Sequence, residues 1–588
     1  MEIFKYYKLR YDKISPLGNT FLRQIRINIK KIKTSSDHTQ ILNILSEAIS
    51  SLSNFQGISK ILSIITKDKT QTGWNGIFKM MEMLSDEIYS DRDIYKILKN
   101  IKKRNLSKKH DEFLTNLIDC FVKMGCNTNQ EKQLKILKIR DIVIQYKSDI
   151  QTYINTGSPI EYCKILSQLE KYKQISSDGV EYINLTLNNY KLFMETITEE
   201  STRKYINVIF SDYVSHILPK FIKMNIYRHN YSKLLDYSSF SKFQENKELI
   251  SRYGSKSWEK ISEIIEKTLG ECINELRNIQ FAGKNTIYNI YYGFEEKKKQ
   301  LINTIPEKFR YFKLEQMLIN ILIIITKLFN LTFKNITSKS QKWNDKTLVF
   351  LINDYYFYID LTENNNDYSD IIKFNEKSLL LIPNKKQEIL FSDIINLSNK
   401  ICTCLCLMIK QNEHILLNDI QDDDIYFISC LIETYITENI YDIIKINDET
   451  IIKKIIETSN IQSSFDMIRL CSLSIIDNYI TTDETFIKNS RNVLDKGSDV
   501  SISTTNKIIH NFISQIFNNT SFKVPKKIQP FDIIDLLDNF NGKLYYKIII
   551  KLIASNFWIS KDCNNDLSIW NTIVNCVKSS KSIFTLLD

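Results

Sequence analysis

Three cysteines, Cys402, Cys404 and Cys406, alternate within a short stretch of the chain. Thiolates that converge on one point bind zinc and other soft metal ions. The surrounding residues are predicted to be helical, and on a helix Cys402 and Cys406 share a face while Cys404 points away. The three thiols cannot then ligate one ion, so small apolar packing is the favoured interpretation.

Other residues that could bind a ligand or take part in catalysis also form no recognisable motif. Asp422, Asp423 and Asp424 resemble part of a calcium loop, but the glycine and the terminal glutamate of such a loop are missing, so a solvated acidic turn is expected. The six histidines form no His-x-x-x-His pair, and no glycine-rich phosphate-binding motif occurs. The histidines stand at positions 38, 110, 216, 229, 414 and 510.

The elements that must position any site are mostly helices. With 13 Gly and 7 Pro in 588 residues, few turns can be encoded, so long helices and more than one domain are expected. Gly125 suits a helix C-terminus and Asn129 an N-cap. Further helices are predicted over 199–210, over 214–227, from near His229, over 256–279, and within 311–334, where apolar residues recur at three- and four-residue steps.

Only one convincing β-hairpin is predicted. The segments KTLVFLI and YYFYIDL flank Asn353 and Asp354, which tolerate the positive φ of a tight turn. Leu379–Ile382 is a second short extended segment, and the chain is expected to be helical from about Ile389 onward.

The net charge of +11 is spread over short clusters such as Lys297–Lys299. A solvated helical surface is favoured, and a basic nucleic-acid-binding face is the alternative. Eleven cysteines without a paired framework, and a charged N-terminus without an apolar segment, indicate an intracellular, cytoplasmic protein. Mitochondrial import is the weaker alternative because Glu2 and Asp12 oppose it. The apolar run Met317–Ile325 is short of the ~20 residues of a membrane span.

The order of features between residues 311 and 374 is more specific. A Tyr311-Phe312-x-Leu314-Glu315 segment is followed by Leu328-Phe329-x-Leu331-x-Phe333, Trp343, the hairpin, and Phe357-Tyr358-x-Asp360-Leu361. This order resembles the thimet oligopeptidase and mitochondrial intermediate peptidase family of zinc metallopeptidases. The resemblance covers about residues 110–588. It implies a mostly α-helical, two-lobed fold with a deep central groove and a small β-sheet.

The zinc site of that family is the part that this chain does not match. The resemblance places Ser392 and Asn396 where the two His of a His-Glu-x-x-His helix stand, and Asp393 where the general-base Glu stands. The third ligand, a Glu in the family, falls at Tyr426 or Phe427, with Asp424 as a displaced carboxylate. No metal and no other cofactor are therefore expected.

The substrate-binding residues implied by the resemblance are also largely replaced. The family's C-terminal His and two of its Tyr residues correspond to Leu536, Asn541 and Ile548, whereas Tyr545 and Tyr546 remain as candidate substrate-binding residues. The Gly that follows the Tyr of its next loop, after the hairpin, corresponds to Ser369.

The resemblance therefore implies an N-terminal helical lobe over 1–200 and a degenerate catalytic domain over 201–588, with the hairpin near 347–361. The expected function is that of an inactive homologue that binds a protein or peptide, or that serves in a larger assembly. The alternatives are an oligopeptidase with a non-standard metal held by Asp393 and a carboxylate at 423–424, and a basic nucleic-acid-binding protein.

Overall fold

The structure, a computed structural model, describes residues 2–102, 108–244, 257–277, 286–362, 370–375, 378–382, 387–409, 422–482, 544–578 except 565, and residues 584 and 586. The chain divides into two compact units, and neither is contiguous in sequence. Unit 1 comprises residues 1–134, 311–446 and 553–588, and unit 2 comprises residues 135–310 and 447–552. The resemblance predicted a different kind of division, into an N-terminal lobe (1–200) and a catalytic domain (201–588). That division stays a prediction.

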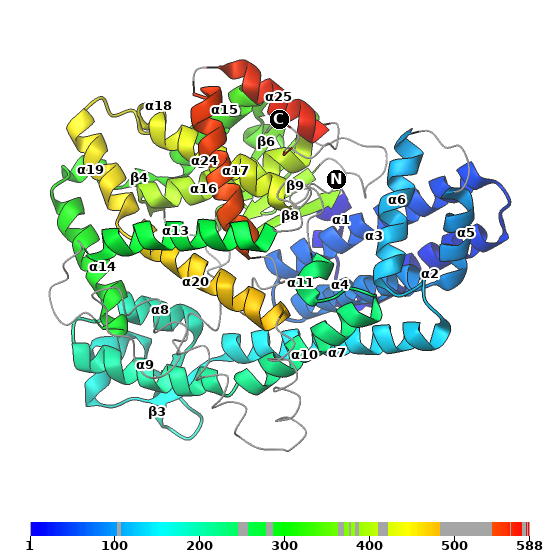
Figure 1. The fold of residues 1–588 in the computed structure, drawn as a ribbon, viewed down its shortest axis with the longest axis horizontal. Coiled ribbons are helices and arrows are strands. Elements are labelled where there is room, and N and C mark those ends of the chain that lie inside the picture. Colours follow the sequence, from blue (N-terminus) through cyan, green and yellow to red (C-terminus); the bar gives the residue numbers. More distant parts are fainter. Residues whose placement is uncertain are drawn as a thin grey trace. The chain divides into compact units, whose positions relative to one another are not determined.

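The first part of unit 1 is a group of packed helices, shown in blue in Figure 1. The side chain of Asp37 caps α3 by accepting the N–H groups of Thr39 and Gln40, at 2.9 and 3.3 Å. Trp74 on α4 is fully buried within the group. The helices are α1 (Glu2–Tyr7), α2 (Tyr11–Thr34), α3 (His38–Ile65), α4 (Asp68–Tyr89), α5 (Arg92–Lys102) and α6 (Lys108–Lys123).

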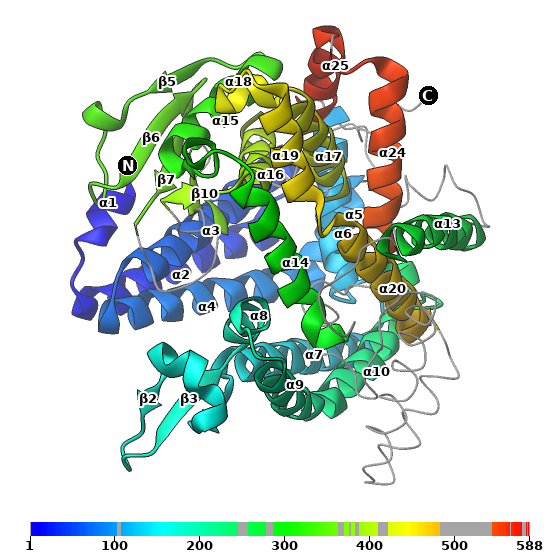
Figure 2. The ribbon, with the colours of Figure 1, turned by 90° about the vertical axis from the view of Figure 1, so that its left-hand side faces the viewer.

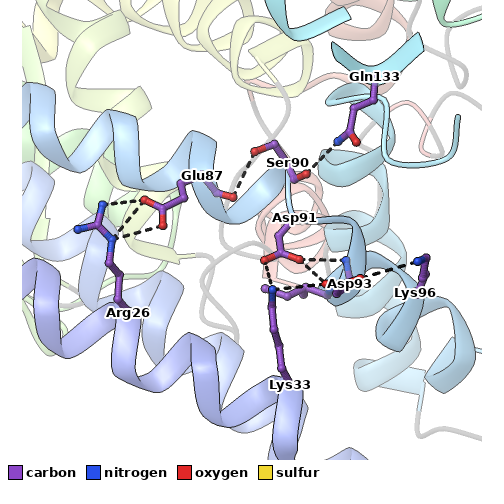
Figure 3. A network of polar contacts seen from close by, with 9 residues as sticks. Arg26, Lys33, Glu87, Ser90, Asp91, Asp93, Lys96 and Gln133 are labelled. Atoms are coloured by element: carbon purple, nitrogen blue, oxygen red, sulfur yellow. Dashed lines mark hydrogen bonds and ion pairs between the residues drawn. The ribbon is translucent and has the colours of Figure 1, made fainter. Parts of the chain in front are cut away.

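Ion pairs on the surface of this group join α2 to α4 and to the beginning of α5 (Figure 3). The Arg26 guanidinium donates to the Glu87 carboxylate at 2.7 Å. The Lys33 ammonium lies 2.6 Å from the Asp91 carboxylate, which raises the pKa of that lysine through a hydrogen bond. Each cation of the network therefore faces a carboxylate.

A five-stranded sheet follows, in the order β5-β6-β7-β9-β8. The predicted hairpin is confirmed: β6 and β7 are antiparallel, Ile352 pairs with Tyr355, and Asn353 has a positive φ of 51°. The predicted extended segment at Leu379–Ile382 is β9, which runs parallel to β7. The strands are β5 (Phe333–Asn335), β6 (Thr347–Ile352), β7 (Tyr355–Asp360), β8 (Asp370–Asn375) and β9 (Ser378–Ile382).

Helices that pack with one another complete unit 1. The predicted apolar face of α15 is confirmed, since Leu318, Ile321, Leu322 and Ile325 are fully buried. Among the described helices, α16 alone is long and apolar enough to cross a membrane by length and composition, a test that buried core helices also pass. The helices are α15 (Leu314–Leu328), α16 (Phe391–Ile409), α17 (Asp422–Glu438), α18 (Ile440–Ile444) and α25 (Leu567–Lys578), with β4 (Phe312–Lys313) pairing with β10 (Glu388–Ile389).

The long helix α7 begins in unit 1 and continues in unit 2. Its predicted cap is confirmed, since Asn129 Oδ1 accepts the N–H of Lys132 at 2.7 Å. Gly125, just before it, has a φ of +78°, as its predicted place at a helix C-terminus requires. The helices are α7 (Gln130–Thr156), α8 (Leu187–Thr196), α9 (Glu200–Ser215), α10 (Leu218–Leu234), α11 (Phe240–Gln244), α13 (Ser257–Arg277), α14 (Ile287–Asn303), α19 (Glu449–Asn460), α20 (Ser463–Thr482) and α24 (Tyr545–Lys561), which runs on into unit 1.

Two expectations about unit 2 were wrong. The hairpin at Asn353 has a counterpart, because β1 (Ser158–Glu161), β2 (Gln174–Ile175) and β3 (Glu181–Leu185) form a sheet in the order β1-β3-β2 (Figure 2). These strands are too short for a clear alternation of apolar and polar residues. No new helix begins near His229, since α10 continues through it with His229 buried.

Candidate functional site

The site that the resemblance implies begins at the first turn of α16. Leu390 is the N-cap residue, because its carbonyl accepts the first helical N–H groups, from Asp393 and Ile394. In return the Asp393 carboxylate accepts the N–H of Leu390 at 3.0 Å. This is the backward half of a capping box, in which the third helical residue bonds the N-cap N–H. Asp393 therefore has a structural task at the start of the helix.

Ser392 and Asn396 lie one turn apart on the less buried face of α16. Asn396 is exposed and Ser392 is half-buried, whereas Phe391, Ile394 and Leu397 on the other side are buried. Asn399 continues the same face, and its Oδ1 atom is buried without a hydrogen-bond donor among the described residues. This face carries a hydroxyl group and two amides, and no imidazole.

The helix that follows packs against α16 in the opposite direction. A hydrogen bond with Cys402 and burial are the main causes that raise the pKa of Cys406, near the end of α16. The charge of Asp424, a buried residue in the first turn of α17, contributes to the same shift, so these two residues lie near each other. Asp393 is thirteen residues before Cys406, about 20 Å along a helix that rises about 1.5 Å per residue. Asp393 and Asp424 therefore belong to opposite ends of the helix pair and do not converge on one ion.

The predicted positions of the third ligand, Tyr426 and Phe427, also lie near Asp424, at the end of the α16–α17 pair opposite Asp393. Tyr426 lies two residues after Asp424; burial and the neighbouring Cys430 and Glu433 raise the pKa of its hydroxyl group. Phe427 is fully buried, and its ring contacts those of Phe557 and Phe584 with centroids 5.6 and 5.7 Å away. Both side chains are used in packing.

Sequence reasoning overlooked the carboxylates near the end of α17. In an antiparallel pair with Asp424 beside Cys406, the residues level with Asn396 lie about ten positions after Asp424. Glu433 stands nine positions after Asp424, and Glu438 stands fourteen positions after it. Glu438 accepts a hydrogen bond from Trp558 Nε1 at 3.0 Å. Glu433 is then the carboxylate available at that level. The position of Glu433 follows from the antiparallel packing of the two helices. No spacing of residues in the sequence indicates it.

The three alternating cysteines are core residues. All three are fully buried, and a hydrogen bond with Cys402 together with burial raises the pKa of Cys406. Burial also raises the pKa of Cys404. Thiols held protonated in an apolar core are poor nucleophiles and poor ligands.

Tyr545 and Tyr546, the candidate substrate-binding residues, begin α24 in the part of the chain that belongs to unit 2. Both are buried, and their ring centroids lie 4.5 Å apart. Ile548, one turn further on, is also fully buried. Leu536, Asn541 and Ser369 lie outside the described residues. A role of the two tyrosines in substrate binding stays a prediction.

The residues at this site do not fit a catalytic zinc ion. Zinc in such a site takes three side chains, chiefly imidazoles with a carboxylate, and keeps one open position. Here the helix offers a hydroxyl, two neutral amides and a carboxylate engaged by a backbone N–H. In the part of the chain that the structure describes, no three His, Cys, Asp or Glu side chains group in a way that could hold a metal, and His414 and His510 lie outside that part.

Comparison with known proteins reveals similarity in fold. No protein-family model matches the sequence, and no curated protein matches it. PZ peptidase A, solved with an inhibitor, shares 12% identity at a TM-score of 0.60, over 99% of this chain and 94% of that one. A candidate peptidase from Chlamydophila abortus shares 12% identity at a TM-score of 0.57, over 95% and 87%.

A third structure agrees with these two. A candidate oligoendopeptidase F from Bacillus anthracis str. Ames shares 11% identity at a TM-score of 0.54, over 97% of this chain and 91% of that one. At such identities the likeness concerns the fold alone. It confirms the predicted class, a mostly α-helical peptidase-like fold with a small β-sheet.

Proposed function

We propose that this chain is a catalytically inactive relative of the zinc metallopeptidases that acts as a protein- or peptide-binding or structural component. The observation that carries the proposal is the hydrogen bond from the Leu390 N–H to Asp393, at 3.0 Å. The side chain at the general-base position thereby caps a helix. A general base must instead reach the water that it activates.

Further support comes from the side chains around Asp393. Ser392 and Asn396 supply a neutral hydroxyl and a neutral amide, which bind zinc far more weakly than imidazole does. Tyr426 and Phe427 are packed at the other end of the helix pair. A chain released from the demands of catalysis keeps the packing of its fold, because stability and solubility still depend on it.

An oligopeptidase with a non-standard metal is the second candidate, and Glu433 is the observation that favours it. We infer from the packing of α17 against α16 that Glu433 lies near the level of Asn396, so an oxygen-rich site would combine Glu433, Asn396 and Asp393. Such a site would suit a hard cation better than zinc. It would also require Asp393 to release the Leu390 N–H.

The test compares metal content and peptide hydrolysis in one protease-free preparation. We expect no tightly bound transition metal after dialysis, and no cleavage of a quenched fluorescent peptide mixture with zinc, manganese, cobalt or magnesium added. Glu433→Gln serves as the matched variant. Hydrolysis that chelation abolishes and that Glu433→Gln removes would contradict the proposal and establish the second candidate. Hydrolysis unaffected by Glu433→Gln but abolished by chelation would contradict both assignments of the residues.

A further inference from the structure

A pocket of about 300 Å³ opens in unit 1 beside the turn of the β6–β7 hairpin. Ile352 and Tyr355, which flank the turn, pair across the two strands, so their side chains lie on the same face of the sheet. Met408 and Ile409, at the end of the described part of α16, contribute another part of the wall. The pocket therefore lies between the sheet and α16, at the hairpin end of the sheet.

The walls of this pocket are apolar. Ile352, Tyr355, Met408 and Ile409 are buried, and Leu331, which follows α15, is half-buried. The volume is at the lower end of the roughly 300–1,000 Å³ of small-molecule sites, which combine apolar walls with a few polar groups that orient the ligand. A small ligand with an apolar body therefore fits these walls.

The remaining lining residues, Asn353 and Lys578, are exposed at the mouth of the pocket, and both offer hydrogen-bond donors. Asn353 Oδ1 accepts the N–H and the hydroxyl of Thr332, at 2.9 and 3.0 Å. These two bonds fix the amide, so its Nδ2 group remains as the donor. Lys578 is the one charged side chain among the described lining residues. Donors and a positive charge beside apolar walls match a carboxylate that carries an apolar body.

The acidic residues nearest to the pocket in sequence are not among its described lining residues. The helix that ends with Lys578, α25, contains no Asp or Glu. Asp354, beside Asn353 in the hairpin turn, is exposed, so solvent screens its charge. Asp424 lies near Cys406, and Met408 points about 200° further round α16, because each helical residue turns by about 100°.

We propose that this pocket binds a small monocarboxylic acid with an apolar body, which enters between the sheet and α16 while its carboxylate accepts hydrogen bonds from Asn353 Nδ2 and the Lys578 ammonium. Two sources share this chemistry, a free medium-chain fatty acid and the C-terminal residue of a peptide that ends in leucine. The inference does not rest on the proposed function, because Ile409 lies sixteen residues after Asp393, about 24 Å along α16.

The first test is isothermal titration calorimetry of the full-length protein with octanoate. A dissociation constant of about 100 µM is expected for a ligand of this size. Octanamide has the same tail without the charge and should bind at least about 10-fold more weakly. N-acetylleucine and N-acetylleucinamide provide the same comparison for the end of a peptide. The carboxylate that binds more tightly identifies the source.

The second test compares octanoate binding by single variants. Lys578→Gln should weaken it at least about 10-fold. A lysine in the last turn of a helix also interacts with the helix dipole. The matched control is therefore Lys561→Gln, which removes an exposed lysine from the last turn of α24 in the same unit and should change the affinity less than about 2-fold.

Two further variants separate the mouth of the pocket from its walls. Asn353→Asp keeps the acceptor for Thr332 and a residue type that tolerates the φ of +51°. It replaces the donor with a negative charge, so at least about 10-fold weaker binding is expected. Leu331→Phe adds bulk to the wall and should weaken octanoate and octanamide equally.

Three results would overturn the proposal. They are the absence of binding of both carboxylates at about 5 mM ligand, equal affinities for octanoate and octanamide, and equal weakening by Lys578→Gln and Lys561→Gln. Thermal unfolding of each variant without ligand shows whether its fold is intact. No peptide bond is cleaved in these titrations. Failure of the pocket therefore leaves the proposed inactivity standing, and hydrolysis of peptides leaves the pocket standing.

Discussion

Two carboxylates of unit 1, Asp360 and Asp393, have very different surroundings. Asp360, at the end of β7, is buried and accepts hydrogen bonds from Trp343 Nε1 at 2.7 Å, from Asn344 Nδ2 at 3.3 Å, and from the N–H and hydroxyl of Thr362 at 2.9 and 2.6 Å. Within the described part of the chain, the Asp393 carboxylate accepts one hydrogen bond, from the Leu390 N–H. Several hydrogen-bond donors therefore converge on Asp360 beside the sheet. They do not converge on Asp393, which stands at the position of the general base.

The difference indicates that side chains that stabilise the fold have kept their partners, whereas side chains at the catalytic positions have not. Trp343 also stacks on Tyr358, with ring centroids 5.4 Å apart, so the Asp360 cluster joins polar and apolar packing. Removing any member would leave a buried group without a partner, which is costly for stability. At the start of α16, polar side chains can change with little effect on folding, since they lie on a partly exposed face.

Restoring a His-Glu-x-x-His sequence at the start of α16 should have the largest effect, and it tests the contrast between Asp360 and Asp393 most directly. In Ser392→His/Asp393→Glu/Asn396→His, two imidazoles one turn apart share a face and can bind one zinc ion. We expect a dissociation constant of about 1 µM, which corresponds to a binding free energy of about −8 kcal/mol. Isothermal titration calorimetry measures it.

Adding Glu433→Gln to that variant tests the register of α16 and α17. A weakening of about 10-fold or more is expected if Glu433 completes the site. Unchanged zinc affinity would show that Glu433 does not reach the ion.

Asp360→Ala should give the largest loss of stability. Several donors around it lose their acceptor, so a cost of about 3 kcal/mol in the free energy of unfolding is expected. Asp360→Asn should cost less, because the amide oxygen still accepts. Thermal unfolding followed by circular dichroism and by tryptophan fluorescence measures both. If the two variants lost equal stability, a negative charge rather than hydrogen bonding would be the main contribution of Asp360.

Asp393→Ala should have a moderate effect. It removes one capping hydrogen bond, worth about 1 kcal/mol, from the beginning of α16. Asp393→Glu should recover part of the loss because glutamate is common at this position of a capping box. The measurement is the unfolding midpoint in urea. A loss as large as that of Asp360→Ala would mean that Asp393 has further partners, and the contrast between the two carboxylates would fail.

Lys33→Met should have the smallest effect. The Asp91 carboxylate raises the pKa of Lys33 above its ordinary value of 10.5, so the ion pair stabilises the folded state below that pH. The contribution is lost as the pH rises through the raised pKa. Because Lys33 is partly exposed, about 0.5 kcal/mol is expected at pH 7. Unfolding of both proteins at pH 7 and pH 11.5 measures it, and a difference that persists at the higher pH would contradict the assignment.

Much of the fold could be predicted because local chemistry encodes it. Asn353 stands at the positive φ of the hairpin turn, Asn129 caps α7, and the three- and four-residue spacing of Leu318, Ile321, Leu322 and Ile325 defines the buried face of α15. Each of these signals lies within a few residues of the structure that it specifies.

The remaining features depend on contacts between distant residues. The sheet of β1–β3 was missed because two-residue β2 gains its definition only by pairing with β3. Glu433 was overlooked because its level relative to Asn396 follows from how α17 lies against α16. The capping role of Asp393 is encoded locally, since Leu390 and Asp393 have the spacing of a capping box, but the signal is weak because leucine is not a favoured N-cap residue.

The interleaving of the two units along the chain has a consequence for how the protein is made. The chain passes from one unit to the other at 134/135, 310/311, 446/447 and 552/553. During synthesis unit 1 therefore cannot be completed until residues 553–588 have also left the ribosome. Nascent chains of this kind expose apolar helix faces for the whole period of translation, so chaperone demand should depend on the speed of elongation.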